Sequence, residues 1–284
     1  MDGANILIIG ANGQLGTALR EQYPHARAVD ADTLDISDRS AVMSFNWSGI
    51  SVVLNAAAYT NVDGAESADG RVLSWKVNAL GPRNLAEAAT QHDITLVHIS
   101  SDYVFDGTKT NHSEDESFSP LNVYGQSKAA GDIAISLSPK HYILRTTWVI
   151  GEGKNFVRTM LDLGQKNIAP AVVADQIGRL TFTHELVCVI DHLLRSSAPF
   201  GTYNATNDGE PASWADITRE IFRLAHFGLT VTDTTTAEYF AGKSGVAPRP
   251  LRSTMNLAKL HGTGFTSRNW HDDLEQYIKK ELTT

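Results

Sequence analysis

The chain of 284 residues carries 42% hydrophobic and 20% charged side chains, which is typical of a globular protein with one large or two modest domains. Its formal net charge of -8 argues against non-specific binding to nucleic acid or to an anionic membrane, because both require a basic surface. Cys188 is the single cysteine, so no intrachain disulfide can form and a reducing, cytoplasmic location is expected. We expect neither a signal peptide nor a transmembrane helix, since no apolar run approaches the roughly 20 residues that a span needs.

A glycine-rich turn follows the first apolar run, residues 6–9, and precedes a helical pattern over residues 14–22. Gly10, Gly13 and Gly16 let the backbone approach a pyrophosphate closely, and free N–H groups at the start of the helix face the phosphate charge. A strand, a glycine turn and a helix in this order predict a dinucleotide-binding site. The alternative is a tight strand–helix turn that binds no ligand.

Short apolar runs alternate with helical patterns through the first half of the chain. Strands are expected at residues 5–9, 27–30, 51–55, 95–100 and 142–145, and helices at residues 14–22, 39–45, 72–91 and 124–137. This alternation predicts an α/β fold, a Rossmann-type doubly wound parallel sheet with helices on both faces. Ligands of such sheets bind beyond the carboxyl ends of the strands, where Gly10, Asp30, residues 55–60 and residues 100–102 fall.

The rhythm becomes less regular after Arg145. Helices are expected at residues 155–164, 183–195, 213–225 and 271–282, with short strands at residues 171–174 and 202–205. We therefore expect residues 1–148 to form a dinucleotide-binding Rossmann domain and residues 149–284 to form mainly a smaller C-terminal substrate-binding domain. The helix at residues 183–195 is expected to pack back on the first domain.

Tyr124 and Lys128 lie four residues apart at the start of a predicted helix, so they share one helix face. A lysine ammonium near a phenol lowers the pKa of the tyrosine, which makes Tyr124 a candidate general acid that protonates an oxygen as hydride arrives at carbon. Lys128 can also hold the hydroxyls of a nicotinamide ribose. The alternative for a lone Y-x-x-x-K pair is a solvated helix face.

Ser100, Ser101 and Asp102 follow an apolar strand, so their side chains are expected at the strand end. The Ser101 hydroxyl can there donate a hydrogen bond to a substrate carbonyl beside Tyr124. Because Ser and Asp also serve routinely in turns and helix caps, a purely structural role is the alternative.

The glycine turn, Ser101 and the Tyr124–Lys128 pair together resemble the extended short-chain dehydrogenase/reductase superfamily, and further blocks resemble its dTDP-4-dehydrorhamnose reductase family. These blocks follow the family order over nearly the whole chain, at residues 55–66, 101–107, 145–149, 154–157, 175–178 and 249–250. Gly64 stands where the family often has lysine, and Leu180 where it often has proline.

The resemblance implies that NADPH or NADH reduces the 4-keto group of dTDP-6-deoxy-L-lyxo-4-hexulose (dTDP-4-dehydro-L-rhamnose) to give dTDP-L-rhamnose. It implies Tyr124 as the proton donor, with Lys128 and Ser101 completing the catalytic set. Cofactor contacts are implied for Gly10, Asn12, Gly13, Gln14, Leu15, Gly16, Asp30, Asp35, Ile36, Ala58, Tyr59, Thr60, Tyr124 and Lys128. Substrate contacts are implied for Ser101, Asp102, Tyr124, Trp148, Asn155 and Arg249.

Asp30 bears on the choice of nicotinamide cofactor. A carboxylate at the end of the second strand binds the adenine ribose hydroxyls and repels a 2′-phosphate, which favours NADH. The family resemblance instead implies NADPH or both cofactors, so the choice between NADH and NADPH stays open.

Some bacterial members of this family hold a magnesium ion between subunits with three glutamates. Glu185 and Glu281 match two of them, but Ala18 replaces the third, and hard cations need several oxygen ligands. We therefore expect no metal and a monomer or homodimer, with a dTDP-sugar as the ligand and neither nucleic acid nor membrane as a partner.

Two other functions stay open for this sequence. Gly64 and Leu180 are compatible with a related nucleotide-sugar 4-ketoreductase of another deoxysugar pathway. A non-catalytic, dinucleotide-binding regulatory subunit is the third possibility, against which the intact set of Ser101, Tyr124 and Lys128 argues.

Overall fold

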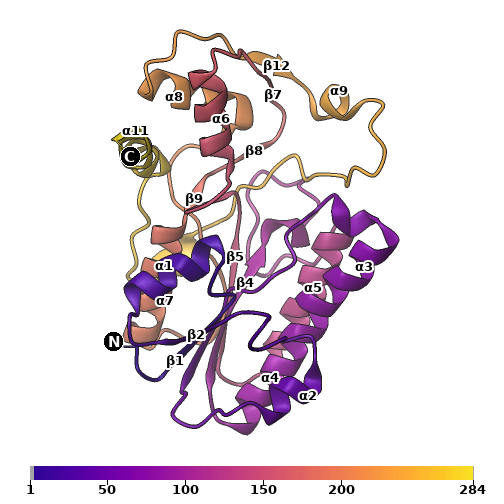
Figure 1. Cartoon of the computed structure of the whole chain (residues 1–284), viewed down its shortest axis with the longest axis vertical. Coiled ribbons are helices and arrows are strands. Elements are labelled where there is room, and N and C mark those ends of the chain that lie inside the picture. Colours follow the sequence, from indigo (N-terminus) through magenta and orange to yellow (C-terminus); the bar gives the residue numbers. More distant parts are fainter. Residues whose placement is uncertain (1–2, 284) are drawn as a thin grey trace.

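The computed structural model describes residues 3–283, and a six-stranded parallel sheet with helices on both faces forms the lower part of the molecule in Figure 1. Its strands are β1 (Ile6–Ile9), β2 (Arg27–Val29), β3 (Val52–Asn55), β4 (Thr95–Ser101), β5 (His141–Thr146) and β10 (Gly201–Asn204). They lie in the order β10-β5-β4-β3-β1-β2, and every neighbouring pair is parallel. The predicted doubly wound α/β fold is confirmed.

The helices cover the sheet and build the upper unit of Figure 1. They are α1 (Gln14–Gln22), α2 (Arg39–Ser44), α3 (Ala68–Trp75), α4 (Gly81–Gln91), α5 (Val123–Ser136), α6 (Phe156–Gln165), α7 (Thr183–Ser196), α8 (Trp214–Leu224), α9 (Thr236–Phe240), α10 (Ala258–His261) and α11 (Trp270–Thr283). No helix within residues 3–283 combines the length and the apolar character that a bilayer span demands.

The strand β1 shows why this region folds as a central layer. Ile6 and Ile8 point to one face and Leu7 and Ile9 to the other, and all four side chains are buried. The first pair packs in a cluster with α1 and α7, whereas the second pair packs with residues of α2, α4 and α5. A strand with apolar side chains on both faces must lie between two layers of helices.

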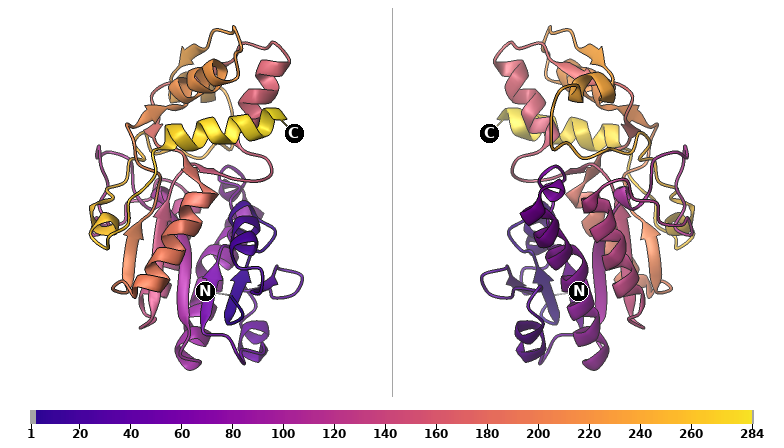
Figure 2. Two further views of the ribbon diagram at one scale, coloured as in Figure 1. Left: turned by 90° about the vertical axis from the view of Figure 1, so that its left-hand side faces the viewer. Right: turned by 90° about the vertical axis from the view of Figure 1, so that its right-hand side faces the viewer.

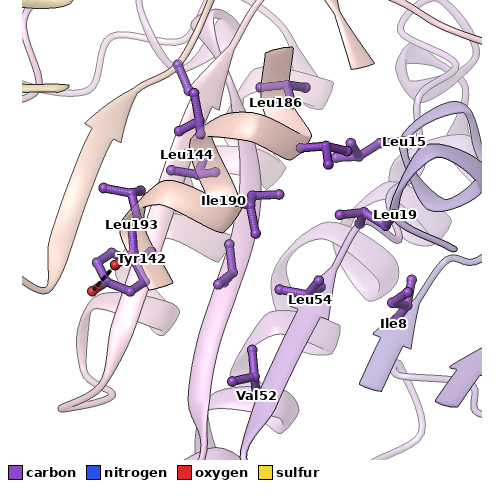
Figure 3. Close-up of a cluster of buried hydrophobic side chains, with 14 of the residues drawn as sticks. Ile8, Leu15, Leu19, Val52, Leu54, Tyr142, Leu144, Leu186, Ile190 and Leu193 are labelled. Atoms are coloured by element: carbon purple, nitrogen blue, oxygen red, sulfur yellow. Dashed lines mark hydrogen bonds between the residues drawn. The ribbon is translucent and has the colours of Figure 1, made fainter. Parts of the chain in front are cut away.

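The helix α7 belongs to the first of these clusters although it lies late in the chain. Figure 3 shows Leu186, Ile190 and Leu193 of α7 near α1 and the strands. The Tyr142 hydroxyl of β5 donates a hydrogen bond to the carbonyl of Leu193 at 3.3 Å. The strand β10 also returns to the sheet, where Gly201 pairs with Tyr142. Residues after 148 therefore complete the sheet region as well as forming the upper unit.

The upper unit is built from α6, α8 and α11 around its own apolar cluster. Figure 2 shows α11 crossing below α8, on the side of the unit that faces the sheet. Its strands are short: β6 (Val149–Ile150), β7 (Ala171–Val173), β8 (Ile177–Gly178), β9 (Thr181–Phe182), β11 (Ala212–Ser213) and β12 (Thr232–Thr234). Of these the sequence predicts only β7, and the others, of two or three residues, are too short to show a readable alternation.

The continuous helix expected at residues 72–91 is wrong in detail. The helical region begins earlier, at Ala68, and a π-helical turn (Lys76–Leu80) separates α3 from α4. Within that turn the Asn78 side chain accepts a hydrogen bond from the N–H of Tyr59 at 2.8 Å and donates one to its carbonyl at 3.0 Å. The widened turn directs this amide at the loop after β3, and such turns are frequent at functional sites.

Candidate active site

The glycine turn lies between β1 and α1, at the carboxyl end of the sheet. Gly10 has a φ of +78°, and a β-carbon on it would lie 2.6 Å from the main-chain nitrogen of Ala57. A β-carbon on Gly16 would overlap the carbonyl oxygen of Gly10, so backbone packs directly against backbone. The helix α1 then begins at Gln14 without a capping side chain among the described residues, which leaves its first N–H groups available to an anion.

Asp30 follows β2 and is tied to this turn. Its Oδ2 accepts a hydrogen bond from the N–H of Asn12 at 3.0 Å, and its Oδ1 accepts one from the N–H of Ala31 at 2.8 Å. Asp35 is exposed, and Ile36 is buried in the cluster that also holds residues of α2 and α4. These three residues do not line the cavity described next.

A cavity of about 710 Å³ opens where the sheet meets the upper unit. Its wall includes most of the predicted site residues, from both halves of the chain: Asn12, Gly13, Gln14, Leu15, Ala58, Thr60, Ser101, Asp102, Tyr124, Lys128 and Trp148. The side chain of Gln14 links the two halves, since its Oε1 accepts a hydrogen bond from the N–H of Gly151 at 2.8 Å. A cavity of this size is in the range of cofactor and small-molecule sites.

Tyr124 lies in the first turn of α5, next to the end of β4. Asn122 caps this helix by accepting a hydrogen bond from the N–H of Gly125 at 2.8 Å. The Tyr124 ring meets the Tyr103 ring edge-on, with centroids 5.6 Å apart. Burial raises the pKa of Tyr124 to about 12, and a hydrogen bond with Ser101 opposes that rise.

Lys128 is buried beneath Tyr124 but does not act on its pKa as the sequence predicts. Its Nζ donates a hydrogen bond to the carbonyl of Ile99 at 2.6 Å and lies 3.5 Å from Nε2 of His98. Burial lowers the pKa of Lys128 to about 8, and Asp132 opposes that shift. The expected lowering of the Tyr124 pKa is therefore wrong for this structure, because the ammonium faces a main-chain carbonyl and burial of the phenol dominates.

Ser101 is the last residue of β4 and lines the cavity. It combines the two roles that the sequence offered, a cavity hydroxyl and a cap of a turn. Its Oγ accepts a hydrogen bond from the N–H of Tyr103, capping the 3-10 turn Asp102–Val104, and donates one to Oδ1 of Asp102; both distances are 3.1 Å. Oδ2 of Asp102 is buried without a hydrogen-bond partner among the described residues. Burial raises the pKa of Asp102 to about 6.

Trp148 stands at the crossing from the sheet to the upper unit. Its φ is +47°, a strained value for a residue other than glycine, and strain of this kind gathers at ligand sites. Its indole stacks on Trp214 with centroids 3.7 Å apart, and Gly178 leaves room for the ring. Trp214 thus packs directly against a residue of the cavity wall.

Asn155 and Arg249 are the predicted substrate contacts that the cavity wall does not include. Asn155 caps α6 instead, and its Nδ2 donates a hydrogen bond to the carbonyl of Gly151 at 2.8 Å. Arg249 forms an ion pair with Asp63 at 2.9 Å. Gly10, Gly16 and Tyr59 also lie outside the wall, since they support it from behind.

Several further lining residues were given no site role in the sequence analysis, although Thr146, Thr147 and Lys154 fall within its family blocks. Thr146 and Thr147 precede Trp148, while Glu152, Gly153 and Lys154 come from the loop before α6. Thr146 is the last residue of β5, where it pairs with Ser101 of β4, and Thr147 follows it, so their position at a strand end was a usable signal. The loop at 152–154 offered no such signal, because only the tertiary fold brings it opposite the glycine turn.

The glutamates considered for a metal site are engaged elsewhere. Glu281 pairs with Arg158 at 2.8 Å, and buried Glu185 accepts a hydrogen bond from the N–H of Arg268 at 3.1 Å. Burial raises the pKa of Glu185 to about 7. Within residues 3–283 no three His, Cys, Asp or Glu side chains are grouped as metal ligands. Cys188, near His184, is only half-buried.

Comparisons with known proteins agree with this geometry. The family model described as "RmlD substrate binding domain" matches residues 4–283. A dTDP-4-dehydrorhamnose reductase of Aggregatibacter actinomycetemcomitans is 38% identical over 96% of this chain and 97% of its own length. A probable dTDP-4,6-dihydroxy-2-methyloxan-3-one 4-ketoreductase of Streptomyces antibioticus is 37% identical over 95% of this chain and 93% of its own. The crystal structure of dTDP-4-dehydrorhamnose reductase from Bacillus anthracis in complex with NADP is 36% identical, covers 97% of this chain and 98% of that one, and superposes with a TM-score of 0.89.

Proposed function

From the premise that the chain belongs to the RmlD substrate binding domain family, we propose that it reduces the 4-keto group of dTDP-6-deoxy-L-lyxo-4-hexulose to dTDP-L-rhamnose with NADPH or NADH. At the coarser level the chain is a dTDP-sugar 4-ketoreductase of that family. The observation that carries the proposal is one cavity whose wall joins the glycine turn to Ser101, Tyr124 and Lys128.

The residues at the glycine turn fit a nicotinamide dinucleotide. A β-carbon on Gly13 would meet no atom nearer than 3.5 Å, so this glycine keeps space open at the start of α1. The uncapped N–H groups of the helix would hold the pyrophosphate there. Asp30 would hold the adenosine end and Lys128 the nicotinamide ribose. The Bacillus anthracis relative, whose structure contains NADP, supports this assignment.

When bound, the reduced nicotinamide supplies the hydride that adds to C4 of the ketosugar. Tyr124 then protonates the C4 oxygen. Its raised pKa, about 12, keeps the phenol protonated at neutral pH and so ready to donate to the more basic alkoxide. The Ser101 hydroxyl would orient the carbonyl oxygen toward Tyr124 by turning its one proton from Oδ1 of Asp102 to the substrate.

The other side chains of the wall would place the sugar. The buried Asp102 carboxylate lines the cavity near the side chains of Ser253 and Thr147, and it would accept a further hydrogen bond from a sugar hydroxyl. The Trp148 indole, held by Trp214, offers an apolar face to the pyranose ring. Asn155 and Arg249 would reach the substrate only after a change in their present contacts. Closure of the upper unit on the sheet would exclude water from the reacting atoms.

A reductase of another deoxysugar is the second candidate. The Streptomyces antibioticus ketoreductase is as similar to this chain as the rhamnose enzyme of Aggregatibacter actinomycetemcomitans, at 37% and 38% identity. Both candidates use the same hydride and proton chemistry, so they differ only in the contacts to the sugar. We also propose a cytoplasmic location and a monomer or homodimer.

The test is to supply purified protein with a panel of dTDP-4-ketosugars and with NADH or NADPH, and to follow nicotinamide absorbance. Turnover with the rhamnose precursor at the highest kcat/KM supports the proposal. A higher kcat/KM with another ketosugar supports the second candidate. If folded protein turns over none of them with either cofactor, reductase function is excluded.

A further inference from the structure

A chain of buried polar side chains runs beneath Lys128, away from the cavity. It consists of Asn55 at the end of β3, His98 in the middle of β4 and Lys128 on α5, each no more than 1% exposed. Nδ2 of Asn55 lies 3.0 Å from Nδ1 of His98, and Nε2 of His98 lies 3.5 Å from Nζ of Lys128. Three side chains from three neighbouring elements therefore meet end to end.

The backbone fixes the orientation of the first member. Oδ1 of Asn55 accepts a hydrogen bond from the N–H of Ala57 at 3.2 Å, so the NH₂ group of this amide is the one that faces His98. Nδ1 of His98 must then be the acceptor. An imidazolium would direct a second N–H at the amide donors, and burial together with Lys128 holds the pKa of His98 well below its usual value. Neutral His98 consequently carries its proton on Nε2.

That proton is directed at Lys128. An ammonium has three donors and no acceptor, whereas a neutral amine has one lone pair that can accept the N–H of His98. With one of its two hydrogens donated to the carbonyl of Ile99, the amine keeps one N–H for the cavity that Lys128 lines. Burial lowers the pKa of Lys128 to about 8, so this neutral amine becomes the main form above that pH.

Charged and titratable groups surround Lys128 on its own helix and on the neighbouring strands β4 and β5. Asp132 on α5 favours the ammonium, but it is itself paired with Arg145 of β5 at 3.0 Å. Tyr124 on α5 and Asp102 after β4 face the same cavity wall. Among these groups His98 is the one whose N–H is directed at Nζ.

We propose that His98 is a positioning residue for Lys128: locked by Asn55 in its Nε2–H form, it donates to Nζ and so aims the remaining lysine N–H into the cofactor cavity. The tautomer is a property of the folded chain alone. Only its benefit to cofactor binding and reduction rests on the proposed function. The same geometry explains why an amide and an imidazole are buried behind a lysine that already has a main-chain acceptor.

The first experiment reads the tautomer directly. Long-range ¹H–¹⁵N spectra of the histidine-labelled protein, with His98 assigned through His98→Gln, should show a protonated Nε2 and a bare Nδ1 at pH 9, where Lys128 is mainly the neutral amine. A protonated Nδ1, or an imidazolium, overturns the proposal. Neither cofactor nor ketosugar is needed, so this result is independent of whether the protein proves to be a reductase.

The second experiment reverses the tautomer. Asn55→Asp puts a carboxylate at Nδ1, which favours the Nδ1–H form and turns Nε2 into an acceptor for the ammonium. The pKa of Lys128, followed through its ¹³Cε resonance and assigned with Lys128→Met, should rise by about one unit or more. Asn78→Asp is the matched control for added buried charge, because Asn78 contacts Ser127 of the same helix but not His98. Equal pKa shifts in the two variants, or no shift in Asn55→Asp, contradict the proposal.

The third experiment separates positioning from packing. Gln at position 98 can accept from Asn55 and donate to Lys128, whereas Leu can do neither. Titrated by nicotinamide fluorescence, His98→Gln should keep the Kd for NADPH within about threefold, and His98→Leu should raise it about tenfold, the worth of one misplaced hydrogen bond. A Kd that is unchanged in both variants, or raised equally in both, assigns His98 a merely structural role and overturns the proposal.

Discussion

The two ends of the cavity are built from different material. At the glycine turn the wall is backbone: Gly10 and Gly16 pack main chain on main chain, and the start of α1 offers open N–H groups. At the opposite end the wall is made of ionisable side chains, the buried Asp102 and Lys128 and the partly buried Tyr124, whose pKa values are all shifted by desolvation. One end therefore depends on shape and the other on protonation. Adding one methyl group should therefore impair folding or cofactor binding at the glycine turn. Removing one oxygen or one charge should impair catalysis or change stability at the ionisable end.

The largest effect is expected at the protonation end. Tyr124→Phe removes the proton donor while keeping the ring that packs on Tyr103, so kcat should fall about 10³-fold, within the range for loss of a general acid. The Kd for NADPH should change less than about threefold, measured by fluorescence titration. Tyr23→Phe is the matched control, because the Tyr23 hydroxyl bonds Asp191 far from the cavity. Full activity in Tyr124→Phe would remove Tyr124 from the mechanism.

At the shape end two glycines should respond differently to the same added methyl group. Gly16→Ala forces a β-carbon into the Gly10 carbonyl oxygen, so the free energy of unfolding should fall by about 1–3 kcal/mol. Gly13→Ala meets no atom nearer than 3.5 Å, so its melting temperature should match that of the unsubstituted protein. Its β-carbon would instead fill the space kept for phosphate, and the Kd for NADPH should rise roughly tenfold or more.

Thermal denaturation and cofactor titration of both variants check this pair. If Gly13→Ala binds NADPH as tightly as the unsubstituted protein, Gly13 does not keep space for the cofactor and this contrast between the two glycines is wrong. It also fails if Gly16→Ala unfolds at an unchanged temperature.

The glycine-turn end of the cavity could be predicted from the sequence, because a glycine-rich turn between an apolar strand and a helix can adopt only a few conformations. The spacing of Tyr124 and Lys128 fixed their common helix face but not the acceptor of the lysine, since Ile99 comes from β4. The partners of Lys128 are set by packing between elements, which a local pattern does not contain. The pKa direction of Tyr124 was missed for the same reason, because burial of the phenol emerges only in the assembled fold.

The upper unit shows a second limit of prediction. Asn155 precedes an amphipathic run, and Asn is a preferred helix cap, so its capping role in α6 was a readable signal. The return of β10 to the sheet was not readable, because a four-residue strand contains no information about its neighbour. The resemblance identified the family through separate blocks, yet it did not show that Asn155 and Arg249 lie outside the cavity wall.

A smaller effect, which depends on pH, is expected from Asp102. Its pKa in the folded protein is about 6, above the ordinary 3.8, so its contribution to stability is fully present below about pH 4 and lost as pH rises through 6. Asp102→Asn removes the charge, so the variant should gain on the unsubstituted protein between pH 4 and 7 by roughly 1–3 kcal/mol. Urea denaturation at several pH values measures this difference. Asp115→Asn, an exposed carboxylate, should show no such trend. A difference that is constant with pH would show that Asp102 ionises normally.

The smallest effect is expected at Asp30, a charged side chain beside the glycine turn. Asp30 is the carboxylate tied to the glycine turn through the N–H of Asn12, and a negative charge there should disfavour the 2′-phosphate of NADPH. Asp30→Ser keeps a hydrogen-bond acceptor but removes the charge, so the ratio of the Kd for NADH to that for NADPH should rise by several-fold, up to about tenfold. Asp32→Ser, an exposed neighbour with the same change in charge, controls for long-range electrostatics. An equal change in both variants would mean that Asp30 acts only through net charge, and the choice of nicotinamide would then lie with other residues around the turn.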